Sequence, residues 1–279
     1  MNALHRLEER ARAWSVSVEH TRDSETSLLG FGRRGGQPVV LKLVKQAGDE
    51  WQSGNIARAF GGHGIARVLE CDDGAVLLER LTPGYSLARL TLNGRDDEAI
   101  DILAETIQTM SGHAPPPECA TVSGWAASFD RYVARDDGRI PRHLVAEAHR
   151  RFLSLEASQR ERQLLHGDLH HYNVLFDSTR GWLAIDPKGV VGEVEFEIGA
   201  TLRNPSERPD LFVSAAIVER RLTRLALRLN INVARTLEWS FAQAVLSAVW
   251  SLEDGLSVEA DAPVLRLATA IQPMLPKWP

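Results

Sequence analysis

The chain has 279 residues, of which 44% are hydrophobic and 25% charged, a composition typical of one large or two modest globular domains. The formal net charge is −5, and residues 1–81 hold 11 basic and 11 acidic side chains, which leaves 21 and 26 for residues 82–279. This acidity argues against nucleic acid as the main partner and is compatible with a cationic small molecule, although a solvated acidic surface explains it equally well.

Cysteine content and hydropathy favour a cytoplasmic protein without membrane association. Cys71 and Cys119 match no metal-binding spacing and are too few for a disulfide framework, so we expect reduced thiols. The first residues, MNALHRLEERARAW, are charged where a secretory signal needs an apolar core. No stretch approaches the ~20 apolar residues that a membrane-spanning helix requires.

The first 81 residues are predicted to form a β-rich domain with one helix. Gly35-Gly36 is a hairpin turn between two segments of strand composition, and Asp73-Gly74 joins a second such pair. Between the pairs, apolar residues at helical spacing and a stop at Gly61-Gly62 predict the helix. The predicted strands are 14–20, 27–34, 38–44, 65–73 and 75–81, and the predicted helix is 49–61.

Residues 82–279 are dominated by long helical segments. Leu103, Ile107 and Met110 follow one another at steps of four and three residues behind an acidic first turn, which suits the helix dipole. We therefore expect an α+β protein with two domains, residues 1–81 and residues 82–279, and a hinge near Pro83-Gly84. The predicted helices are 96–110, 123–136, 142–158, 209–229, 233–253 and 261–272.

The segment HGDLHHYNVLF (166–176) contains the strongest functional pattern. Asp168 and Asn173 lie five residues apart in a loop, and Asp186 follows at the end of a second apolar run. A turn at 178–181 would make a hairpin that brings Asn173 and Asp186 to the same end. Their oxygen ligands suit Mg²⁺, with phosphates and water completing its shell. Asp168 is then free to accept the proton of an attacking hydroxyl, as in protein kinases.

The histidines of this segment allow two other interpretations. His166, His170 and His171 could hold zinc, but two of them are adjacent and no fourth ligand stands at a familiar spacing. A polar turn without chemistry would explain neither the spacing of Asp168 and Asn173 nor the acid after the next strand. We therefore assign the chemistry to Asp168 and Asn173 and expect His166 to orient the loop backbone. His170 and His171 receive no role.

Lys42 is the candidate phosphate-binding cation. It is the only charge in the strand VVLKLV, where a lysine is costly unless it is paired. Glu50, at the start of the next helix, is the better placed partner and Asp49 the alternative. The other interpretation is a lysine that extends to solvent from an edge strand.

The loop before residue 28 has no glycine-rich motif. Protein kinases place G-x-G-x-x-G between their first two strands, whereas this chain has DSETS (23–27). The hydroxyls and backbone N–H groups of Ser24, Thr26 and Ser27 could bind phosphate instead, although a plain turn also fits.

With these residues assembled, the sequence resembles the aminoglycoside phosphotransferases, a branch of the protein-kinase-like fold. The spans LHGDLHHYNVLF and GWLAIDPKGVVGEVEFEIGATLRNP are most similar to streptomycin 6-phosphotransferases and hydroxyurea phosphotransferases. The resemblance is strong over 165–205 and looser through 23–84. It implies a small N-terminal antiparallel sheet with one helix and a larger, mainly helical C-terminal part.

The resemblance also implies roles for individual residues. Asp168 becomes the catalytic base, and Asn173 with Asp186 binds Mg²⁺. Lys42 with Glu50 positions the phosphates of ATP. The backbone near Glu79 and Leu81 is expected to contact the adenine. Asp186, the second residue implied to bind the metal, lies in the sequence IDP rather than in the DFG of protein kinases. The family tolerates this departure.

Acceptor recognition is assigned to carboxylates, because streptomycin-like acceptors carry guanidinium groups that pair with carboxylates bidentately. Alternation would place Glu193, Glu195 and Glu197 on one face of an extended segment, with Glu193 nearest the catalytic loop. A solvated acidic strand edge is the other interpretation. The predicted acceptor-binding residues are Glu193, Glu197, Asp210, Glu253 and Asp254.

The sequence thus predicts a monomeric or weakly dimeric enzyme that uses ATP and Mg²⁺ to phosphorylate a hydroxyl of a small cationic acceptor, with streptomycin-type aminoglycosides preferred. Two alternatives stay open. One is a kinase of hydroxyurea or of a housekeeping metabolite on the same fold, and the other is a catalytically silent nucleotide-binding protein.

Overall fold

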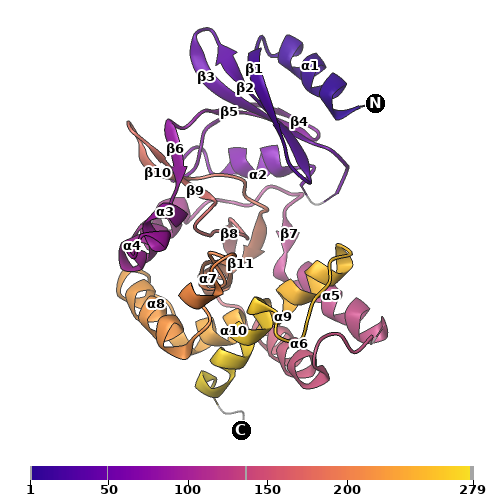
Figure 1. The fold of residues 1–279 in the computed structure, drawn as a ribbon, viewed down its shortest axis with the longest axis vertical. Helices are drawn as coiled ribbons and strands as arrows, with labels where there is room; N and C mark the ends of the chain where they lie inside the picture. The colour runs from indigo at the N-terminus through magenta and orange to yellow at the C-terminus, as the bar shows by residue number, and fades with distance from the viewer. Residues whose placement is uncertain (1, 49, 136, 277–279) are drawn as a thin grey trace.

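A five-stranded antiparallel sheet forms one end of the molecule in the computed structural model, which describes residues 2–48, 50–135 and 137–276 (Figure 1). The strand order is β1-β2-β3-β5-β4, so β3 is the central strand. Every neighbouring pair in the sheet is antiparallel, as predicted for this part of the chain. The strands are β1 (Ser17–Asp23), β2 (Ser27–Arg34), β3 (Gln37–Val44), β4 (Val68–Asp72) and β5 (Ala75–Glu79).

Two helices pack against this sheet, one more than the sequence predicted. The additional helix is α1 (Ala3–Ala13), which buries only Leu7 and Ala11 in an otherwise charged segment and therefore gave a weak apolar pattern. The expected helix is α2 (Ser53–Ala59), which is shorter than predicted. Its Gly54 permits close packing, because a Cβ there would lie 2.6 Å from the Cβ of Cys71.

Two small sheets occupy the middle of the molecule. In the first, the order is β10-β9-β6, and β9 pairs with β10 from Val174↔Ala184 to Asp177↔Gly181, which confirms the predicted hairpin. The second has the order β7-β11-β8. The strands are β6 (Pro83–Ser86), β9 (Val174–Asp177), β10 (Gly181–Ala184), β7 (Ala120–Thr121), β11 (Val190–Gly192) and β8 (Gln163–Leu165).

Helices build the other end of the molecule around α9, which is buried along most of its length and packs against α6, α7 and α10. The predicted helix 209–229 is divided, because Ser214 caps a new helix by accepting the N–H of Ile217. The helices are α3 (Ala88–Leu92), α4 (Asp96–Met110), α5 (Val122–Arg135), α6 (Arg142–Ala157), α7 (Val194–Leu202), α8 (Ala215–Arg228), α9 (Val233–Glu253) and α10 (Pro263–Ile271), with 3-10 turns η1 (Pro209–Leu211) and η2 (Gln272–Met274).

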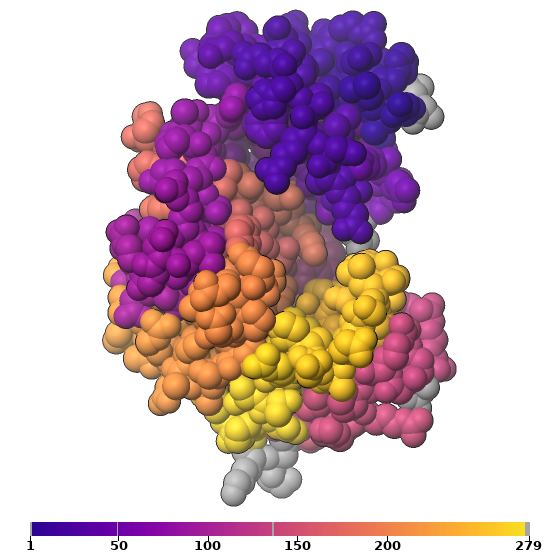
Figure 2. Space-filling model, in the orientation of Figure 1, coloured from indigo at the N-terminus to yellow at the C-terminus, as the bar shows by residue number. Residues whose placement is uncertain are grey.

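The surface is hollowed between the sheet and the helices. In Figure 2 the salmon atoms of the middle of the chain are visible inside this hollow, below the indigo sheet and beside the yellow C-terminal segment. A large hydrophobic core lies among the helices, and a separate one lies between α1 and the sheet. The α+β class is confirmed, while the limit between the two predicted domains at residues 81 and 82 stays a prediction. Within the described residues, no helix is long and apolar enough to cross a membrane.

Candidate active site

His166 connects the catalytic loop at Asp168 to the end of the hairpin at Ile185. Its Nε2–H donates to the carbonyl of Ile185 at 2.9 Å, and its Nδ1 accepts the amide N–H of Asp168 at 3.2 Å. The second bond requires a lone pair on Nδ1, so the ring is neutral and carries its proton on Nε2. Burial lowers the pKa of His166 to about 4, which keeps the ring in this form. The expected role of His166 in orienting the loop is therefore confirmed.

The carboxylate of Asp168, the predicted base, faces three basic side chains. Arg203 Nη2 lies 3.3 Å from Oδ1, while His170 Nε2 at 3.7 Å and Lys188 Nζ at 3.9 Å face Oδ2. Burial opposes ionisation, but His170, Lys188 and Arg203 outweigh it and hold the pKa of Asp168 well below its ordinary value. Asp168 is thus an ionised, oriented hydrogen-bond acceptor.

The hairpin brings Asn173 and Asp186 to the same end of two paired strands. Val174 and Ala184 are partners in register, and Ile185 N donates to the carbonyl of Asn173 at 2.8 Å. Asn173 Nδ2 donates to the carbonyl of Asp168 at 3.0 Å, which joins this end of the hairpin to the catalytic loop. Asp186 has a φ of 60°, in the left-handed region, where non-glycine residues are strained and often functional.

The donor set of Asn173 and Asp186 fits a hard cation. Within the described residues the side-chain oxygen of Asn173 accepts no hydrogen bond, and only one oxygen of Asp186 is engaged. No cluster of three or more His, Cys, Asp or Glu that could hold a metal is present in the described part of the chain. Two protein oxygens match Mg²⁺, which commonly takes the rest of its shell from phosphate and water.

Lys42 lies on the central strand β3 and is buried, with 8% of its side chain exposed. Its ammonium donates to Glu50 Oε2 at 3.1 Å and to the Oδ1 of Asp186. Burial alone would lower the pKa of Lys42, but Asp186 and Glu50 outweigh it and raise the pKa. The edge-strand alternative is therefore wrong. Glu50 pairs from a turn rather than from a helix, and Asp49 lies outside the described residues.

The loop between β1 and β2 is closed by its own side chains. Ser24 Oγ accepts the N–H of Ser27 at 3.1 Å and lies 3.0 Å from its hydroxyl. Thr26 Oγ1 donates to Glu50 Oε2 at 3.4 Å, so the loop is connected to the partner of Lys42. Hydroxyls thus shape a loop that contains no glycine, and all three residues line the adjoining cleft.

This cleft has a volume of about 660 Å³ and lies between the sheet and the hairpin. Lys42 and Asp186 line it, as do Glu79 and Leu81 from the end of β5 and the connection that follows. The Glu79 carboxylate accepts the N–H of Arg67 at 2.8 Å and a bond from Arg180. Among the described residues, the N–H and C=O of Leu81 have no hydrogen-bond partner, so both are available to a planar heterocycle.

The expected extended segment at 193–197 is wrong, because α7 begins at Val194. Apolar and acidic residues alternate there, but α7 is buried on most of its surface, so alternation does not distinguish strand from helix. Glu193 precedes the helix and is 3% exposed. Its carboxylate binds Arg235 and the indole N–H of Trp239, which leaves it directed into the protein rather than toward an acceptor.

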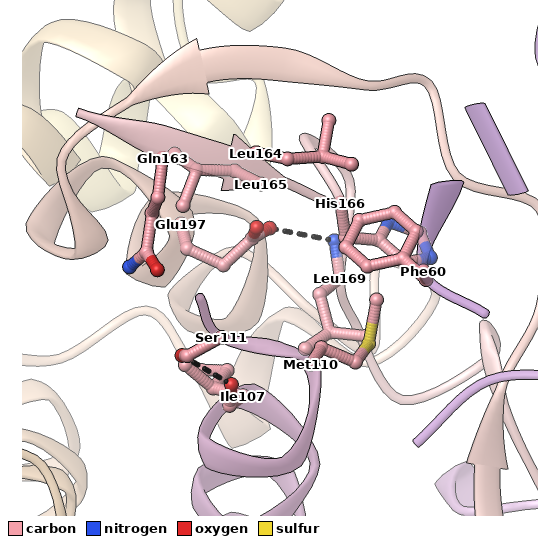
Figure 3. A pocket seen from close by; sticks show the side chains of 10 residues that line it. All are labelled: Phe60, Ile107, Met110, Ser111, Gln163, Leu164, Leu165, His166, Leu169 and Glu197. Atoms are coloured by element: carbon pink, nitrogen blue, oxygen red, sulfur yellow. Dashed lines mark hydrogen bonds between the residues drawn. The ribbon is translucent and has the colours of Figure 1, made fainter. Parts of the chain in front are cut away.

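Glu197 lies behind the catalytic loop rather than in the cleft. Its carboxylate accepts the N–H of Gly167 at 3.1 Å and that of Leu169 at 3.4 Å, and Figure 3 shows it directed at the loop backbone. Burial raises the pKa of Glu197 to about 7, although these N–H groups favour the ionised form. The contacts assign Glu197 to support of the loop, and they leave no exposed surface for the predicted acceptor contact.

The other predicted acceptor-binding residues are more exposed. Asp210 lies in η1, where its carboxylate pairs with Arg208 at 2.7 Å. Glu253, at the end of α9, accepts from Ser128 at 2.9 Å and from Arg131 at 2.7 Å. Asp254 is the exposed cap residue that follows. Glu253 and Asp254 are therefore near Trp250 of the same helix.

Sequence reasoning missed four residues around Asp168. Arg203 reaches it from the end of α7, and Lys188 from the segment after Asp186. Trp125 of α5 and Trp250 of α9 stand edge to face with centroids 5.2 Å apart. A Cβ on Gly167 would lie 3.1 Å from Trp125, so the pair adjoins the loop. Lys188 and Arg203 both lie in the span GWLAIDPKGVVGEVEFEIGATLRNP that carries the family resemblance, and this was the only signal available for any of the four.

His171 is directed away from the cleft into a buried polar cluster. Its side chain is fully buried, both ring nitrogens lack a partner among the described residues, and Nε2 lies 4.0 Å from Asp96 Oδ1. Arg221 binds the same carboxylate at 2.8 Å from α8. Burial and the charge of Arg221 lower the pKa of His171 well below its ordinary value. The cluster connects the catalytic loop with α4 and α8.

Comparison with known proteins gives a family match that spans most of the chain. The family described as aminoglycoside/hydroxyurea antibiotic resistance kinase matches residues 12–255. A streptomycin 3''-kinase of Klebsiella pneumoniae is 35% identical over 229 residues, which cover 80% of this chain and 83% of that protein. A streptomycin 6-kinase of Streptomyces griseus is 30% identical, covering 87% and 80%. A hydroxyurea phosphotransferase of Kitasatospora aureofaciens is 31% identical, covering 82% and 66%.

Solved structures show the same fold at low sequence identity. A thermostable mutant of aminoglycoside phosphotransferase APH(4)-Ia, in a ternary complex with ADP and hygromycin B, superposes with a TM-score of 0.65 at 18% identity, covering 95% of this chain and 97% of that one. A choline/ethanolamine kinase family protein from Mesorhizobium loti gives 0.63 at 15% identity, covering 95% of both. The protein-kinase-like fold that the sequence predicted is therefore confirmed.

Proposed function

Since this chain belongs to the aminoglycoside/hydroxyurea antibiotic resistance kinase family, we propose that it transfers the γ-phosphoryl group of ATP to a hydroxyl of a streptomycin-type aminoglycoside. The observation that carries the proposal is the convergence of four side chains from three segments of the chain at or beside one cleft. Lys42, Asp168, Asn173 and Asp186 all lie at or beside this cleft of about 660 Å³. A silent nucleotide-binding protein would not need an ionised, oriented Asp168 beside the hairpin.

The nucleotide is assigned to the cleft between the sheet and the hairpin. The N–H and C=O of Leu81, which have no partner among the described residues, suit the adenine edge, and Glu79 holds this connection in place through Arg67 and Arg180. Lys42, supported by Glu50, reaches the phosphates from the central strand. Ser24, Thr26 and Ser27 line the same cleft and offer donors to the phosphates. Residues 1–81 are thus proposed as the nucleotide-binding domain, and residues 82–279 as the catalytic domain.

Asn173 and Asp186 are proposed to hold Mg²⁺ with their side-chain oxygens. When bound, the ion neutralises phosphate charge during transfer. Asp168 orients the acceptor hydroxyl and takes its proton, a role that suits an ionised carboxylate. Arg203 and the N–H groups that fix the loop keep Asp168 in place, so the base needs no rearrangement before reaction.

The acceptor is assigned to the side of Asp168 where α5 and α9 meet. Trp125 provides aromatic surface there, and Asp254 adds an exposed negative charge at the end of α9, next to Glu253, which already pairs with Arg131. Guanidinium groups bind both aromatic faces and carboxylates. These features, and not Glu193 or Glu197, are the proposed acceptor contacts. We further propose that the enzyme works in the cytoplasm as a monomer or weak dimer.

A panel of acceptors tests the proposal. The purified protein with ATP and Mg²⁺ should release ADP with streptomycin, and mass spectrometry should show product heavier by one phosphoryl group. Hydroxyurea is the second candidate, because the matching family includes it and one relative is named for it. Turnover of hydroxyurea alone would replace the streptomycin assignment. No turnover with aminoglycosides, hydroxyurea or common metabolites would contradict phosphotransfer itself.

Analysis of the product identifies which hydroxyl is phosphorylated. Relatives of this chain are named as 3''-kinases and as 6-kinases of streptomycin, so phosphorus-coupled NMR of the product assigns the position. Expression in a susceptible strain should raise its tolerance of streptomycin. The Asp168→Asn variant is the control in both experiments, since it preserves the shape of the site.

A further inference from the structure

Lys188 lies at the centre of the site on a well-fixed backbone. It follows Asp186 by two residues, and the next residue, Gly189, donates its N–H to the carbonyl of His166 at 2.9 Å. Gly189 has a φ of 77°, and a Cβ there would lie 2.5 Å from Cγ2 of Ile56. Glycine is therefore required at this position, and it fixes the point from which the lysine side chain extends.

The ammonium of Lys188 is incompletely paired. Its Nζ lies 3.9 Å from Asp168 Oδ2 and 5.9 Å from the ring centroid of Trp250, and 47% of the side chain is exposed. It makes no hydrogen bond to any residue that the structure describes. An ammonium carries three donors, so this one can bind an additional anion without losing a protein partner.

The other two basic groups around Asp168 are less available. Arg203 is 10% exposed and is fixed by Gln243 at 3.2 Å as well as by Asp168. His170 is 16% exposed, and its Nδ1 accepts the N–H of Tyr172 at 3.2 Å. Arg203 and His170 are thus suited to orienting Asp168, whereas Lys188 is suited to contacting a ligand.

The sign of the charge decides which ligand Lys188 contacts. This step rests on the proposed function. A cationic aminoglycoside is repelled by an ammonium, whereas the phosphoryl group in transit is anionic and must pass close to Asp168 to reach the acceptor oxygen. We propose that Lys188 is a catalytic residue that binds the transferring phosphoryl group beside Asp168.

In the proposed step, the acceptor oxygen forms a bond to the γ-phosphorus while the bond from that phosphorus to the β–γ bridging oxygen breaks. The electron pair of the broken bond stays on ADP. The hydroxyl proton passes to the carboxylate of Asp168 and then to solvent. Lys188 donates to an equatorial oxygen of the phosphoryl group, and Trp250 holds the ammonium near that position.

Lys42 and Lys188 then bind phosphate groups at different stages of the reaction. Lys42 is buried and already bonded to Glu50 and Asp186, so it acts on a bound nucleotide in its ground state. Lys188 is exposed and makes no hydrogen bond within the described part of the chain, so its contact forms when the phosphoryl group moves toward Asp168. An interaction made mainly in the transition state lowers kcat on removal and leaves substrate affinity nearly unchanged.

The test compares Lys188→Met with wild type and with Arg33→Met, a matched loss of one exposed positive charge on β2. We expect Lys188→Met to lower kcat by about 100- to 1,000-fold with the KM for ATP and acceptor changed less than about threefold. Lys188→Arg, which keeps the charge, should recover part of the loss. Thermal unfolding checks that each variant is folded, and the 47% exposure of the side chain favours this.

A binding measurement gives a second readout that needs no acceptor. ADP with Mg²⁺ and fluoroaluminate mimics the phosphoryl group in transit, so Lys188→Met should weaken this complex by at least about 10-fold while binding ADP with Mg²⁺ as wild type does. Unchanged fluoroaluminate affinity would overturn the proposal and leave Lys188 as a positioning residue for Asp168. This outcome is distinct from failure of the proposed function, in which wild type itself turns over no acceptor.

Discussion

The amide N–H of Gly167 donates to the carboxylate of Glu197 at 3.1 Å, one residue before the proposed base. Leu169, on the other side of Asp168, donates to the same carboxylate at 3.4 Å. A buried acid on α7 therefore fixes the backbone on both sides of Asp168. Because it lies behind the loop, it can stabilise the site without contacting any substrate.

The titration of Glu197 predicts a pH-dependent stability. Burial raises the pKa of Glu197 from 4.5 to about 7, so the folded protein binds a proton there that the unfolded chain releases. This contribution is fully present below pH 4.5 and is lost as the pH rises to about 7, for a total of roughly 3 kcal/mol. Urea unfolding from acid to neutral pH should show wild type losing stability relative to Glu197→Gln, which does not titrate. Parallel curves for the two proteins would contradict the raised pKa.

Asp168→Asn should lower kcat by about 10²- to 10⁴-fold, because the amide cannot take the hydroxyl proton. ADP binding should stay at the wild-type level, since Asp168 lies outside the residues that line the nucleotide cleft. Steady-state kinetics and calorimetric titration with ADP provide the two measurements. Turnover close to that of wild type would remove Asp168 from its proposed role.

Asn173→Ala and Asp186→Ala should each raise the Mg²⁺ concentration needed for half-maximal ADP binding by at least about 10-fold, because each removes an oxygen ligand. Asn93→Ala is a matched control, since Asn93 is exposed on the helical side and its side chain bonds only to the carbonyl of Arg89 among the described residues. Titration of Mg²⁺ at fixed ADP measures the effect. A requirement shifted by only one of the two variants would show that the hairpin supplies one ligand rather than two.

Arg221→Met should destabilise the fold by about 3–5 kcal/mol, because it leaves the mostly buried carboxylate of Asp96 without its main partner. Arg221 also donates to the carbonyl of Asn204 at 2.8 Å, so a second acceptor loses its bond. Chemical unfolding measures the loss, and Arg33→Met, in an exposed pair with Glu19, should change stability by less than about 0.5 kcal/mol. Equal effects of the two substitutions would show that the buried pair of Arg221 and Asp96 contributes no more to the stability of the fold than an exposed pair does.

The sequence by itself determined the local parts of this protein. Asp168, Asn173 and Asp186 are separated by a short loop and one tight hairpin, so their spacing along the chain nearly specifies their arrangement in space. Lys42 was identifiable because a single charge in an apolar strand requires a partner, and Glu50 is near enough in sequence to supply one. Strand composition and turn residues likewise predicted the antiparallel sheet.

Only the tertiary structure decided which of the predicted acceptor-binding acids are buried. The sequence favoured Glu193, which is nearest the catalytic loop, over Glu253, but the start of α7 places Glu193 and Glu197 in the interior, where Arg235 and the amide of Gly167 bind them. The groups around Asp168 come from segments far apart, Lys188 from the loop after β10 and Arg203 from the end of α7. Spacing along a chain reports only neighbours within one element or turn, whereas these contacts exist because separate helices and strands pack against one another.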